Sequence, residues 1–394
     1  SINILLIQAF SALAAGGAIV CAQYIGQKNY EKANMSARQV LFIITAISVA
    51  VSAVCLIFQK PLLRFIFGAV EADVMRASET YFFFTALSFP FIAAYDSAAS
   101  IFRAQENTKG PMTISMISNV MNIGGNAILI WVFHLGVAGA ALSTLVSRIF
   151  CAVVVLYQLR KDRQPIVVRD YLKIRPDWGM IKRILGLGIP SGVENSMFQL
   201  GKLAIQSTVS TLGTTAIAAQ AMTNILENLN GIAAIGVGVG LMTIVGQCLG
   251  AGRKDEAVYY IKKLCVIAEF VIIASCLVVY ILARPVTILG GMEKESAAMC
   301  IHMITWITIV KPLVWTMGFV PGYGLRAAGD VKFSMITSCC TMWACRFCLC
   351  VFLIRVLGFG PMGVWIGMFA DWTVRGIIFT WRFHSRKWLE HKVI

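Results

Sequence analysis

Residues 22–33 read AQYIGQKNYEKA, and residues 246–257 read GQCLGAGRKDEA. These two polar stretches lie 224 positions apart in a chain that is otherwise strongly apolar. The pairs in register are Gln23/Gln247, Gly26/Gly250 and Ala33/Ala257. A long period of this kind indicates a duplicated structural unit, because a chance echo would not keep its register.

The composition predicts the class of protein. Hydrophobic residues make up 58% of the 394 residues and charged residues only 13%, which is typical of a membrane protein and not of a soluble one. A helix needs about 20 apolar residues to cross the hydrocarbon core. Eleven such spans are predicted, at 4–22, 39–59, 80–102, 112–133, 137–159, 184–211, 215–245, 262–283, 301–323, 333–354 and 362–381. Their lengths and lack of alternation favour helices over barrel strands.

The positive charge follows the predicted topology. The net charge is +15, and if the loops alternate sides, 23 of the 34 Lys and Arg residues fall on one side, eight of them between Arg160 and Arg183. The positive-inside rule makes that side cytoplasmic, together with the C-terminus, and predicts a multi-pass protein of the cytoplasmic membrane. The basic residues therefore report topology and contact with anionic lipids, and nucleic acid is not an expected partner.

Further echoes keep nearly the same offset. FRAQENTK at 102–109 aligns with LRAAGDVK at 325–332, and Gly136 and Gly139 align with Gly360 and Gly363. Each echoed loop lies on the cytoplasmic side both times, so the two halves are expected to share one orientation about a pseudo-twofold axis along the membrane normal.

The halves differ at their beginnings. Residues 181–212 form a predicted helix that has no counterpart in the first half, and the chain opens with Ser1 inside an apolar run. We therefore expect a leading span to precede this sequence, and six helices in each half of the complete protein. The expected domains are a first lobe at 1–164 with five helices, a cytoplasmic linker at 165–180 and a second lobe at 181–394 with six.

Five motifs in order resemble the multidrug and toxic compound extrusion (MATE) family. They are FRAQENTKGPM at 102–112, GVAGAALSTLVSR at 136–148, GIPSG at 188–192, LGTTAIAAQ at 212–220 and VGQCLGAGRKDEA at 245–257. The resemblance covers essentially the whole chain. It implies two six-helix bundles in a V, a monomer that alternates between inward and outward openings, and export of cationic amphiphilic drugs in exchange for Na⁺ or H⁺.

Acidic side chains inside predicted spans are costly and are therefore functional candidates. Glu194 and Glu227 are the leading pair, because both lie in spans that line the cavity of the family that the chain resembles. A buried carboxyl group with a raised pKa can carry a proton, and an ionised one can attract a cationic drug. The alternative is structural: either acid could neutralise Lys202 or Arg346.

Two more acids fall in spans. Asp371 lies four residues before Arg375, and this spacing predicts an ion pair along one helix face. Asp96 lies about two turns from the cytoplasmic end of its helix and is a weaker candidate for the substrate cavity.

Asn122 and Asn126 in MNIGGN lie on one helix face, and Thr144 lies on the next span. Their oxygens are hard ligands suited to Na⁺, and the family's first-lobe cation site looks similar, with an additional Asp on the helix expected before this sequence. At the repeat offset the second lobe carries Arg346 and Cys350, and a guanidinium would repel a cation. The alternative is that the two amides only hydrogen-bond across the bundle.

The resemblance to the MATE family suggests a substrate cavity lined by aromatic and methionine side chains. Better-known members carry an acid on the tenth helix, but that place falls near Trp315 here, so a coupling scheme based on that acid is in doubt. The candidates for a stacking, polarizable wall are Tyr95, Met197, Phe198, Trp315 and Met317. Such side chains in a span also commonly face lipid or core.

The matching turns have a structural interpretation. Arg103 and Arg326 lie at helix ends, where they can meet carbonyl groups or lipid phosphates, and Asn107 and Asp330 can cap the next helix.

Other motifs are absent or weak. Cys345, Cys348 and Cys350 lack a second cluster or a neighbouring His, so no metal and no cofactor are expected. No catalytic or nucleotide-binding motif is present, which favours a transporter driven by an ion gradient over an enzyme. Two alternatives stay open: a flippase for lipids or lipid-linked oligosaccharides, which favours more cavity cations, and an intramembrane enzyme, which needs a catalytic pair.

Overall fold

The computed structural model describes residues 2–394, and these residues fold into helices and turns without any strand. Their contacts divide the chain into two compact units, one ending at Gly192 and the other comprising Val193–Val393. The division falls inside a long helix, α7 (Trp178–Val209), so the predicted linker at 165–180 precedes it. The lobe boundaries predicted from the sequence stay a prediction.

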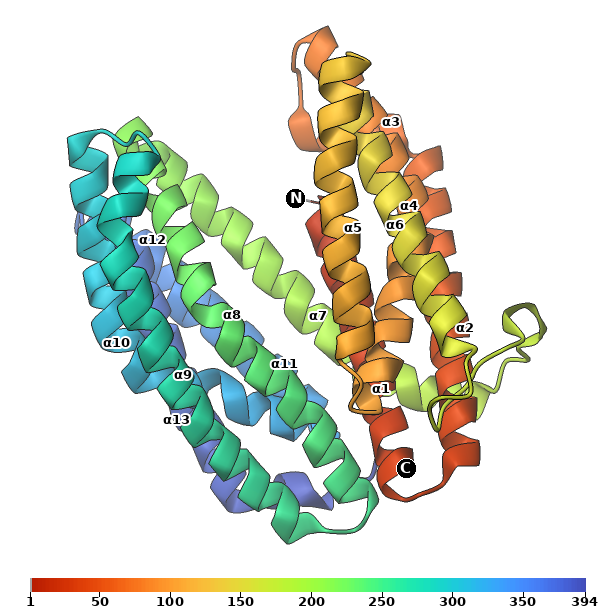
Figure 1. Cartoon of the computed structure of the whole chain (residues 1–394). Coiled ribbons are helices and arrows are strands. Elements are labelled where there is room, and N and C mark those ends of the chain that lie inside the picture. The colour runs from red at the N-terminus through yellow and green to blue at the C-terminus, as the bar shows by residue number, and fades with distance from the viewer. Residues whose placement is uncertain (1) are drawn as a thin grey trace. The chain divides into compact units, whose positions relative to one another are not determined.

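The first unit is built from long helices (Figure 1). Its elements before α7 are α1 (Ile2–Gly26), α2 (Tyr30–Ile57), α3 (Gln59–Phe67), α4 (Ala72–Ala104), α5 (Lys109–Ala127), the π-helical turn η1 (Ile128–Val132), α6 (Val137–Leu159) and the short turn η2 (Tyr171–Lys173). Helix α4 lies at the centre, because it packs against α1, α2 and α6.

The second unit repeats this order. After α7 come η3 (Ser210–Leu212), α8 (Thr214–Gly250), α9 (Lys254–Leu289), α10 (Lys294–Ala327), α11 (Val331–Thr341), the π-helical segment η4 (Met342–Cys348), α12 (Leu349–Arg355), α13 (Met362–Ser385) and η5 (Lys387–Glu390). Helix α10 packs against α8, α9 and α13. It therefore has the central place that α4 has in the first unit.

The turns explain why the opening stretches are alike. After α1, the amide of Asn29 donates to the carbonyl of Tyr24 over 3.0 Å, and after α8 the amide of Arg253 donates to the carbonyl of Cys248 over 2.9 Å. Both are the six-residue hydrogen bonds of a Schellman helix end. Such an end requires one residue in the left-handed region, which is Lys28 (φ 57°) in the first unit and Gly252 (φ 74°) in the second.

The same match recurs at further interhelical turns. Left-handed residues occur in the pairs Gly68/Gly291, Glu106/Gly329, His134/Gly358 and Gly136/Gly360, each at an offset of 223 or 224. The duplicated sequence therefore encodes duplicated backbone turns, which bend the chain between consecutive helices.

Nine helical segments are long and apolar enough to cross a membrane among the described residues. The predicted count of eleven is not reproduced, because α7 and α13 are absent from this set. Both are present as helices of 32 and 24 residues. Polar side chains interrupt the middle of each helix, Glu194 and Asn195 in α7 and Asp371 and Arg375 in α13.

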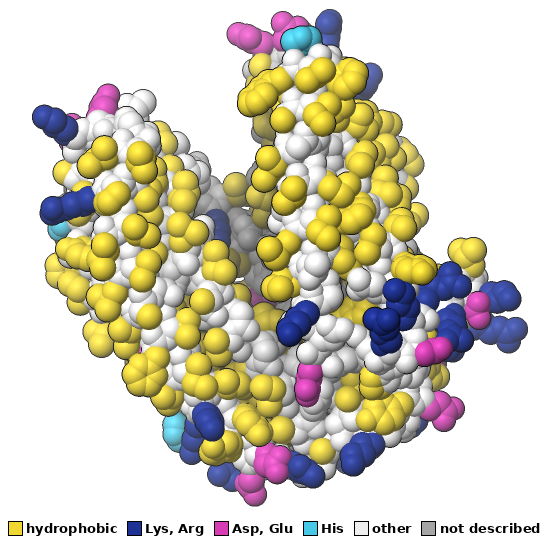
Figure 2. Space-filling model, viewed as in Figure 1, with side chains coloured by type: hydrophobic (Ala, Val, Ile, Leu, Met, Phe, Trp, Pro, Cys, Tyr) yellow, Lys and Arg dark blue, Asp and Glu magenta, His cyan; other side chains and the backbone are white. Residues whose placement is uncertain are grey.

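The helix flanks are apolar on the outside. In the first unit Val120, Ile123 and Trp131 are 70%, 70% and 76% exposed, and Figure 2 shows hydrophobic side chains along the visible flanks with charged side chains gathered near helix ends. Exposed apolar surface of this extent is what a hydrocarbon environment favours.

Candidate functional site

The three predicted cation-site residues of the first unit form one polar cluster. The amide Nδ2 of Asn126 donates to Oδ1 of Asn122 over 3.2 Å, and Nδ2 of Asn122 donates to the hydroxyl of Thr144 over 3.4 Å. The Thr144 hydroxyl in turn donates to the carbonyl of Ala140 over 3.1 Å. The sequence was therefore right to group these side chains across two helices.

A close approach of α5 and α6 brings the cluster together. A Cβ on Gly125 would lie 2.4 Å from Oγ of Ser143, so only glycine fits there without displacement. The Ser143 hydroxyl donates to the backbone carbonyl of Asn122 over 3.0 Å. The π-helical turn η1 begins two residues after Asn126, and such turns often accompany functional sites.

One acceptor of the cluster is unused. Oδ1 of Asn126 is buried without a hydrogen-bond partner among the described residues. An unpartnered buried oxygen requires an explanation, and a bound cation would supply one. The cluster thus combines an interhelical hydrogen bond with one buried acceptor that a cation can use.

Asp96 lies in a different polar region of the first unit. Its Oδ2 atom is buried without a hydrogen-bond partner, and within residues 2–394 it forms no ion pair. The neighbouring Tyr95 hydroxyl donates to the carbonyl of Pro111 over 2.9 Å, which turns it toward α5. Arg148 donates to Ser88 over 2.6 Å.

In the second unit Glu227 is engaged by Lys311. The Lys311 Nζ lies 2.6 Å from Oε1 of Glu227 and 3.3 Å from its backbone carbonyl, and it also donates to Oδ1 of Asn230. The ring centroids of Trp315 and Trp372 lie 5.4 and 5.7 Å from Nζ. Lys311 is fully buried, and the three protons of its ammonium group all have acceptors. The ammonium group therefore has no donor left for a further ligand.

Glu194 is engaged by Arg326. The Arg326 Nη2 donates to Oε1 of Glu194 over 3.0 Å, and the hydroxyl of Ser334 donates to Oε2 over 3.4 Å. Both acids are therefore ion-paired, as the structural alternative expected, but their partners are Arg326 and Lys311 and not Lys202 or Arg346. The physical reason is that α10, the central helix, supplies both cationic partners.

The predicted caps have mixed outcomes. Asn107 accepts a hydrogen bond from the amide of Gly110 in the first turn of α5 over 3.3 Å, although the residue at the N-cap position is Thr108. Asp330 makes no side-chain cap bond; its carboxylate instead accepts from Arg382 over 2.7 Å. The prediction that Asp330 caps α11 was thus wrong, because an ionic partner on another helix competes with local capping. Arg326 pairs with Glu194, and its contact with lipid phosphates stays a prediction.

The predicted pair on α13 is confirmed. Arg375 Nη2 donates to both carboxylate oxygens of Asp371, over 3.0 and 3.2 Å, and both side chains are buried. Arg375 also lies over Phe319, with its Cζ 4.8 Å from the ring centroid. Asp371 is therefore neutralised on its own helix.

The remaining wall candidates have different surroundings. Trp315 is 4% exposed and stacks on Phe319 with centroids 4.8 Å apart, so it belongs to the interior of the second unit. Met317, two residues on, is 39% exposed, and Met197 is partly exposed. Phe198 is partly buried and lies next to cationic side chains.

Sequence reasoning missed the part played by Lys311, Asn230 and Trp372. A signal was present: a single lysine in the apolar run IVKPLV cannot remain buried without acceptors on a neighbouring helix. Which neighbour would supply them depends on the packing, and the sequence does not contain that information locally.

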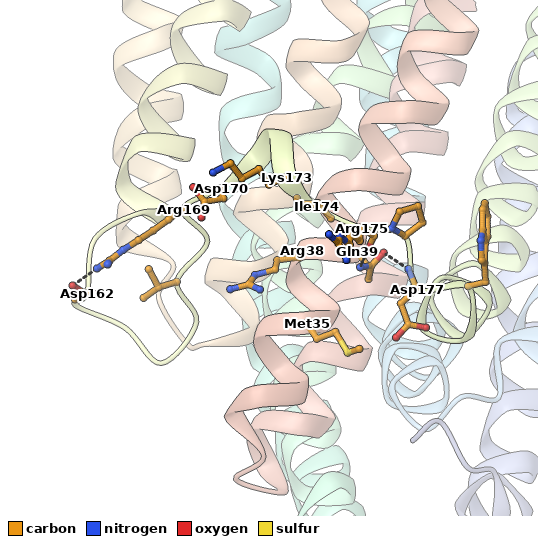
Figure 3. Close-up of a pocket in the computed structure, with 13 residues that line it drawn as sticks. Met35, Arg38, Gln39, Asp162, Arg169, Asp170, Lys173, Ile174, Arg175 and Asp177 are labelled. Carbon is orange, nitrogen blue, oxygen red and sulfur yellow. Dashed lines mark hydrogen bonds and ion pairs between the residues drawn. The ribbon is translucent and has the colours of Figure 1, made fainter.

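A hollow of about 920 Å³ lies between α2 and the segment that follows α6 (Figure 3). Its lining residues are Met35, Arg38, Gln39, Asp162, Val167, Arg169, Asp170, Lys173, Ile174, Arg175, Pro176, Asp177 and Trp178. The amide of Gln39 donates to the carbonyl of Arg175 over 2.8 Å, and its oxygen accepts from the amide of Asp177 over 3.1 Å. These bonds attach the predicted linker to α2.

The linker is also fixed at Tyr171. Its hydroxyl donates to the carbonyl of Leu156 over 2.6 Å. Burial raises the pKa of Tyr171 to about 12, against a smaller opposing effect of Arg160. The hydroxyl therefore stays protonated and keeps this bond at neutral pH.

The comparisons place this fold in a family. The MatE family model matches residues 1–128 and 190–352, so the chain belongs to the MatE family. The uncharacterized transporter YisQ of Bacillus subtilis is 25% identical over 98% of this chain and 85% of its own length. The probable multidrug resistance protein NorM of Thermotoga maritima is 24% identical over 97% and 82%.

A solved structure supports the fold. The outward-facing conformation of a multidrug resistance MATE family transporter of the MOP superfamily matches with a TM-score of 0.88 at 20% identity, over 98% of this chain and 86% of that one. Together with the apolar helices, these findings show a multi-pass membrane protein.

Proposed function

We propose that this protein is a secondary active exporter of amphiphilic, drug-like compounds, cations among them, which it exchanges for Na⁺ or H⁺ by alternating access. The observation that carries the proposal is the MatE family match across both halves of the chain. A relative that aligns over 97% of the chain is named a probable multidrug resistance protein. The relatives do not favour the flippase alternative.

The Asn122, Asn126 and Thr144 cluster is the proposed coupling-ion site. It lies between two long helices and has a buried amide oxygen available to a cation. A site built from neutral oxygens binds Na⁺ without having to release a proton, because amides do not titrate. The cluster thus supports Na⁺ as its ion.

Glu194 and Glu227 are the proposed proton-responsive groups of the second unit. Each carboxylate is held by one cation, at 3.0 Å for Arg326 and 2.6 Å for Lys311. Protonation of either acid would weaken its ion pair and leave the cation without a counter-charge, which favours a rearrangement of α10. Asp96, with its unpartnered Oδ2, is the proposed acidic group of the first unit's substrate wall.

The test uses an efflux-deficient bacterial host and measures ethidium accumulation with and without a Na⁺ gradient. We expect the wild type to exclude ethidium in a gradient-dependent way. Asn126→Leu should lower the Na⁺-dependent component at least about tenfold, equal to about 1.4 kcal/mol, because it removes the free oxygen at similar volume. Ile123→Leu, at an exposed apolar position of the same helix, is the matched control.

Glu194→Gln in the same assay separates the two ions. A loss of exclusion that no Na⁺ gradient restores would support a protonatable coupling group in the second unit. Absence of exclusion of any cationic dye by well-expressed wild-type protein would refute drug export.

A further inference from the structure

The interior of the second unit contains a cation that forms no hydrogen bond or ion pair through its guanidinium among the described residues. Arg346 is 5% exposed, and its Nε and Nη1 atoms are buried without a hydrogen-bond partner among the described residues. Leaving a buried charge unpaired costs several kcal/mol. A guanidinium is a planar set of donors that matches a carboxylate, sulfonate or phosphate.

The acids around Arg346 are already engaged. The carboxylates that act on it electrostatically are Asp371 and Glu227. Asp371 is bound by Arg375 through two hydrogen bonds, and Glu227 is bound by Lys311. Neither makes a hydrogen bond or an ion pair with Arg346 among the described residues.

Three cationic side chains lie around the ring of Phe198. The Cζ of Arg346 lies 4.9 Å from the ring centroid of Phe198, the Nζ of Lys202 lies 5.1 Å from it, and the Cζ of Arg375 lies 6.0 Å from it. Lys202 is exposed and has no ion-pair partner within residues 2–394. Two of the three cations around Phe198 thus form no ion pair in the described part of the chain.

The backbone is adapted to this position. Arg346 lies in the π-helical segment η4, whose extra residue per turn changes the direction of the side chains. Its carbonyl is so close to α13 that a Cβ on Gly367 would lie 2.8 Å from it. The backbone of η4 at Arg346 therefore packs tightly against α13. The guanidinium of the same residue has two nitrogens, Nε and Nη1, without a hydrogen bond among the described residues.

We propose that Arg346, with Lys202 and the ring of Phe198, binds the anionic group of an aromatic amphiphile. The inference rests on the proposed export function and sharpens its substrate class, to compounds with a carboxylate, sulfonate or phosphate next to an aromatic ring. A zwitterion satisfies both the site and the proposed selection of amphiphilic cations. The anionic group forms hydrogen bonds to Nε and Nη1, while the aromatic ring of the compound packs against the edge of Phe198.

The experiment uses two dyes that differ by one methyl ester. Rhodamine 110 has a free carboxylate at neutral pH, and rhodamine 123 is its methyl ester on the same ring system. Binding to the purified full chain in detergent is measured by fluorescence polarisation. We expect Arg346→Gln to weaken rhodamine 110 at least tenfold and rhodamine 123 by less than twofold, with partial recovery in Arg346→Lys.

The matched control is Arg355→Gln. Arg355 is exposed on the following helix, so this substitution removes the same charge from the surface and not from the interior. Lys202→Gln, at an exposed position, is expected to weaken rhodamine 110 about threefold. A measurement without any variant uses the wild type: benzoate should compete with rhodamine 110, and benzyl alcohol at the same concentration should not.

The outcomes separate the two ideas. Equal losses for both dyes in Arg346→Gln, or wild-type binding of rhodamine 123 alone, would overturn the anion site while the export proposal stands. If the wild type binds neither dye and exports no cationic dye, the export proposal fails and the anion site fails with it. If Arg346→Gln does not fold, the benzoate competition and Lys202→Gln decide.

Discussion

The two units carry opposite chemistry at matching places of one duplicated scaffold. Position 122 of the first unit aligns with position 346 of the second, so that an amide in one half is a guanidinium in the other. In the first half the carbonyl of Asn122 accepts from the hydroxyl of Ser143, and in the second half the carbonyl of Arg346 faces Gly367, at the position that matches Ser143.

The difference shows that the two halves share their backbone turns but not the polar side chains of their interiors. Five pairs of left-handed turn residues recur at an offset of 223 or 224, because helix ends must keep the same geometry for the bundle to close. The polar interior is under no such restraint. Neutral oxygens thus gather at Asn122, Asn126 and Thr144, and unpaired positive charge gathers at Arg346.

The largest effect is expected when the guanidinium of the second unit is introduced at the matching position 122 of the first. We expect Asn122→Arg to abolish Na⁺-dependent dye efflux, because a guanidinium beside Asn126 repels the cation that the cluster is proposed to bind. Asn122→Gln keeps the amide and is expected to retain part of the activity. Size-exclusion profiles of both variants establish that they are folded. Undiminished Na⁺ dependence in folded Asn122→Arg would refute the cation site.

The next effect concerns the paired charges of the second unit. Glu227→Gln leaves Lys311 buried without a counter-charge and should destabilise the protein by about 3–5 kcal/mol, seen as a lower thermal midpoint in detergent. The double variant Glu227→Gln with Lys311→Met should recover most of the loss. The control is Glu256→Gln, which removes an exposed pair with Arg253 and should cost less than about 1 kcal/mol. Similar losses in Glu227→Gln and the control would mean that the buried pair is not structural.

The third prediction compares the two matching helix contacts, at Gly367 in the second unit and at Ser143 in the first. Gly367→Ala forces a Cβ toward the Arg346 carbonyl, and overpacking of this kind costs about 1–3 kcal/mol. Ser143→Ala only removes one hydrogen bond to Asn122, worth about 0.5–1.5 kcal/mol. Chemical denaturation of the detergent-solubilised protein measures both. A larger loss for Ser143→Ala than for Gly367→Ala would mean that the contact at Gly367 accommodates a methyl group.

The smallest effect lies in the matching turns. Lys28 holds a left-handed conformation that Gly252 holds at the equivalent place. Lys28→Gly should therefore stabilise slightly or leave stability unchanged, since relief of the left-handed strain is offset by greater freedom of the unfolded chain, whereas Gly252→Ala should destabilise by about 1 kcal/mol. Paired thermal melts test the contrast. If Gly252→Ala raised the midpoint, the turn geometry would be wrong.

Much of the architecture could be predicted from local patterns. Apolar runs predicted the helices, the offset of 224 predicted matching turns, and four-residue spacing predicted both the Asn122–Asn126 contact and the Asp371–Arg375 pair. These features depend on residues close in sequence or on repetition. Local spacing is enough to place them, because a helix sets which side chains share a face.

The ionic partners could not be predicted in this way. Glu227 lies 84 positions from Lys311, and Glu194 lies 132 positions from Arg326. Several acids and cations were available in the spans, and the sequence gives no order of preference among them. Asp330 likewise had the position of a helix cap but pairs with Arg382, 52 residues away.

The sequence by itself determined that this protein is helical and membrane-spanning, that its halves repeat, and that amide oxygens gather in one half. Only the tertiary structure decided which charges neutralise one another, and that Arg346 is the buried cation left without a partner among the described residues. The physical reason is range. Helix formation and turns follow from neighbours along the chain, whereas the pairing of buried charges depends on which helix faces pack together.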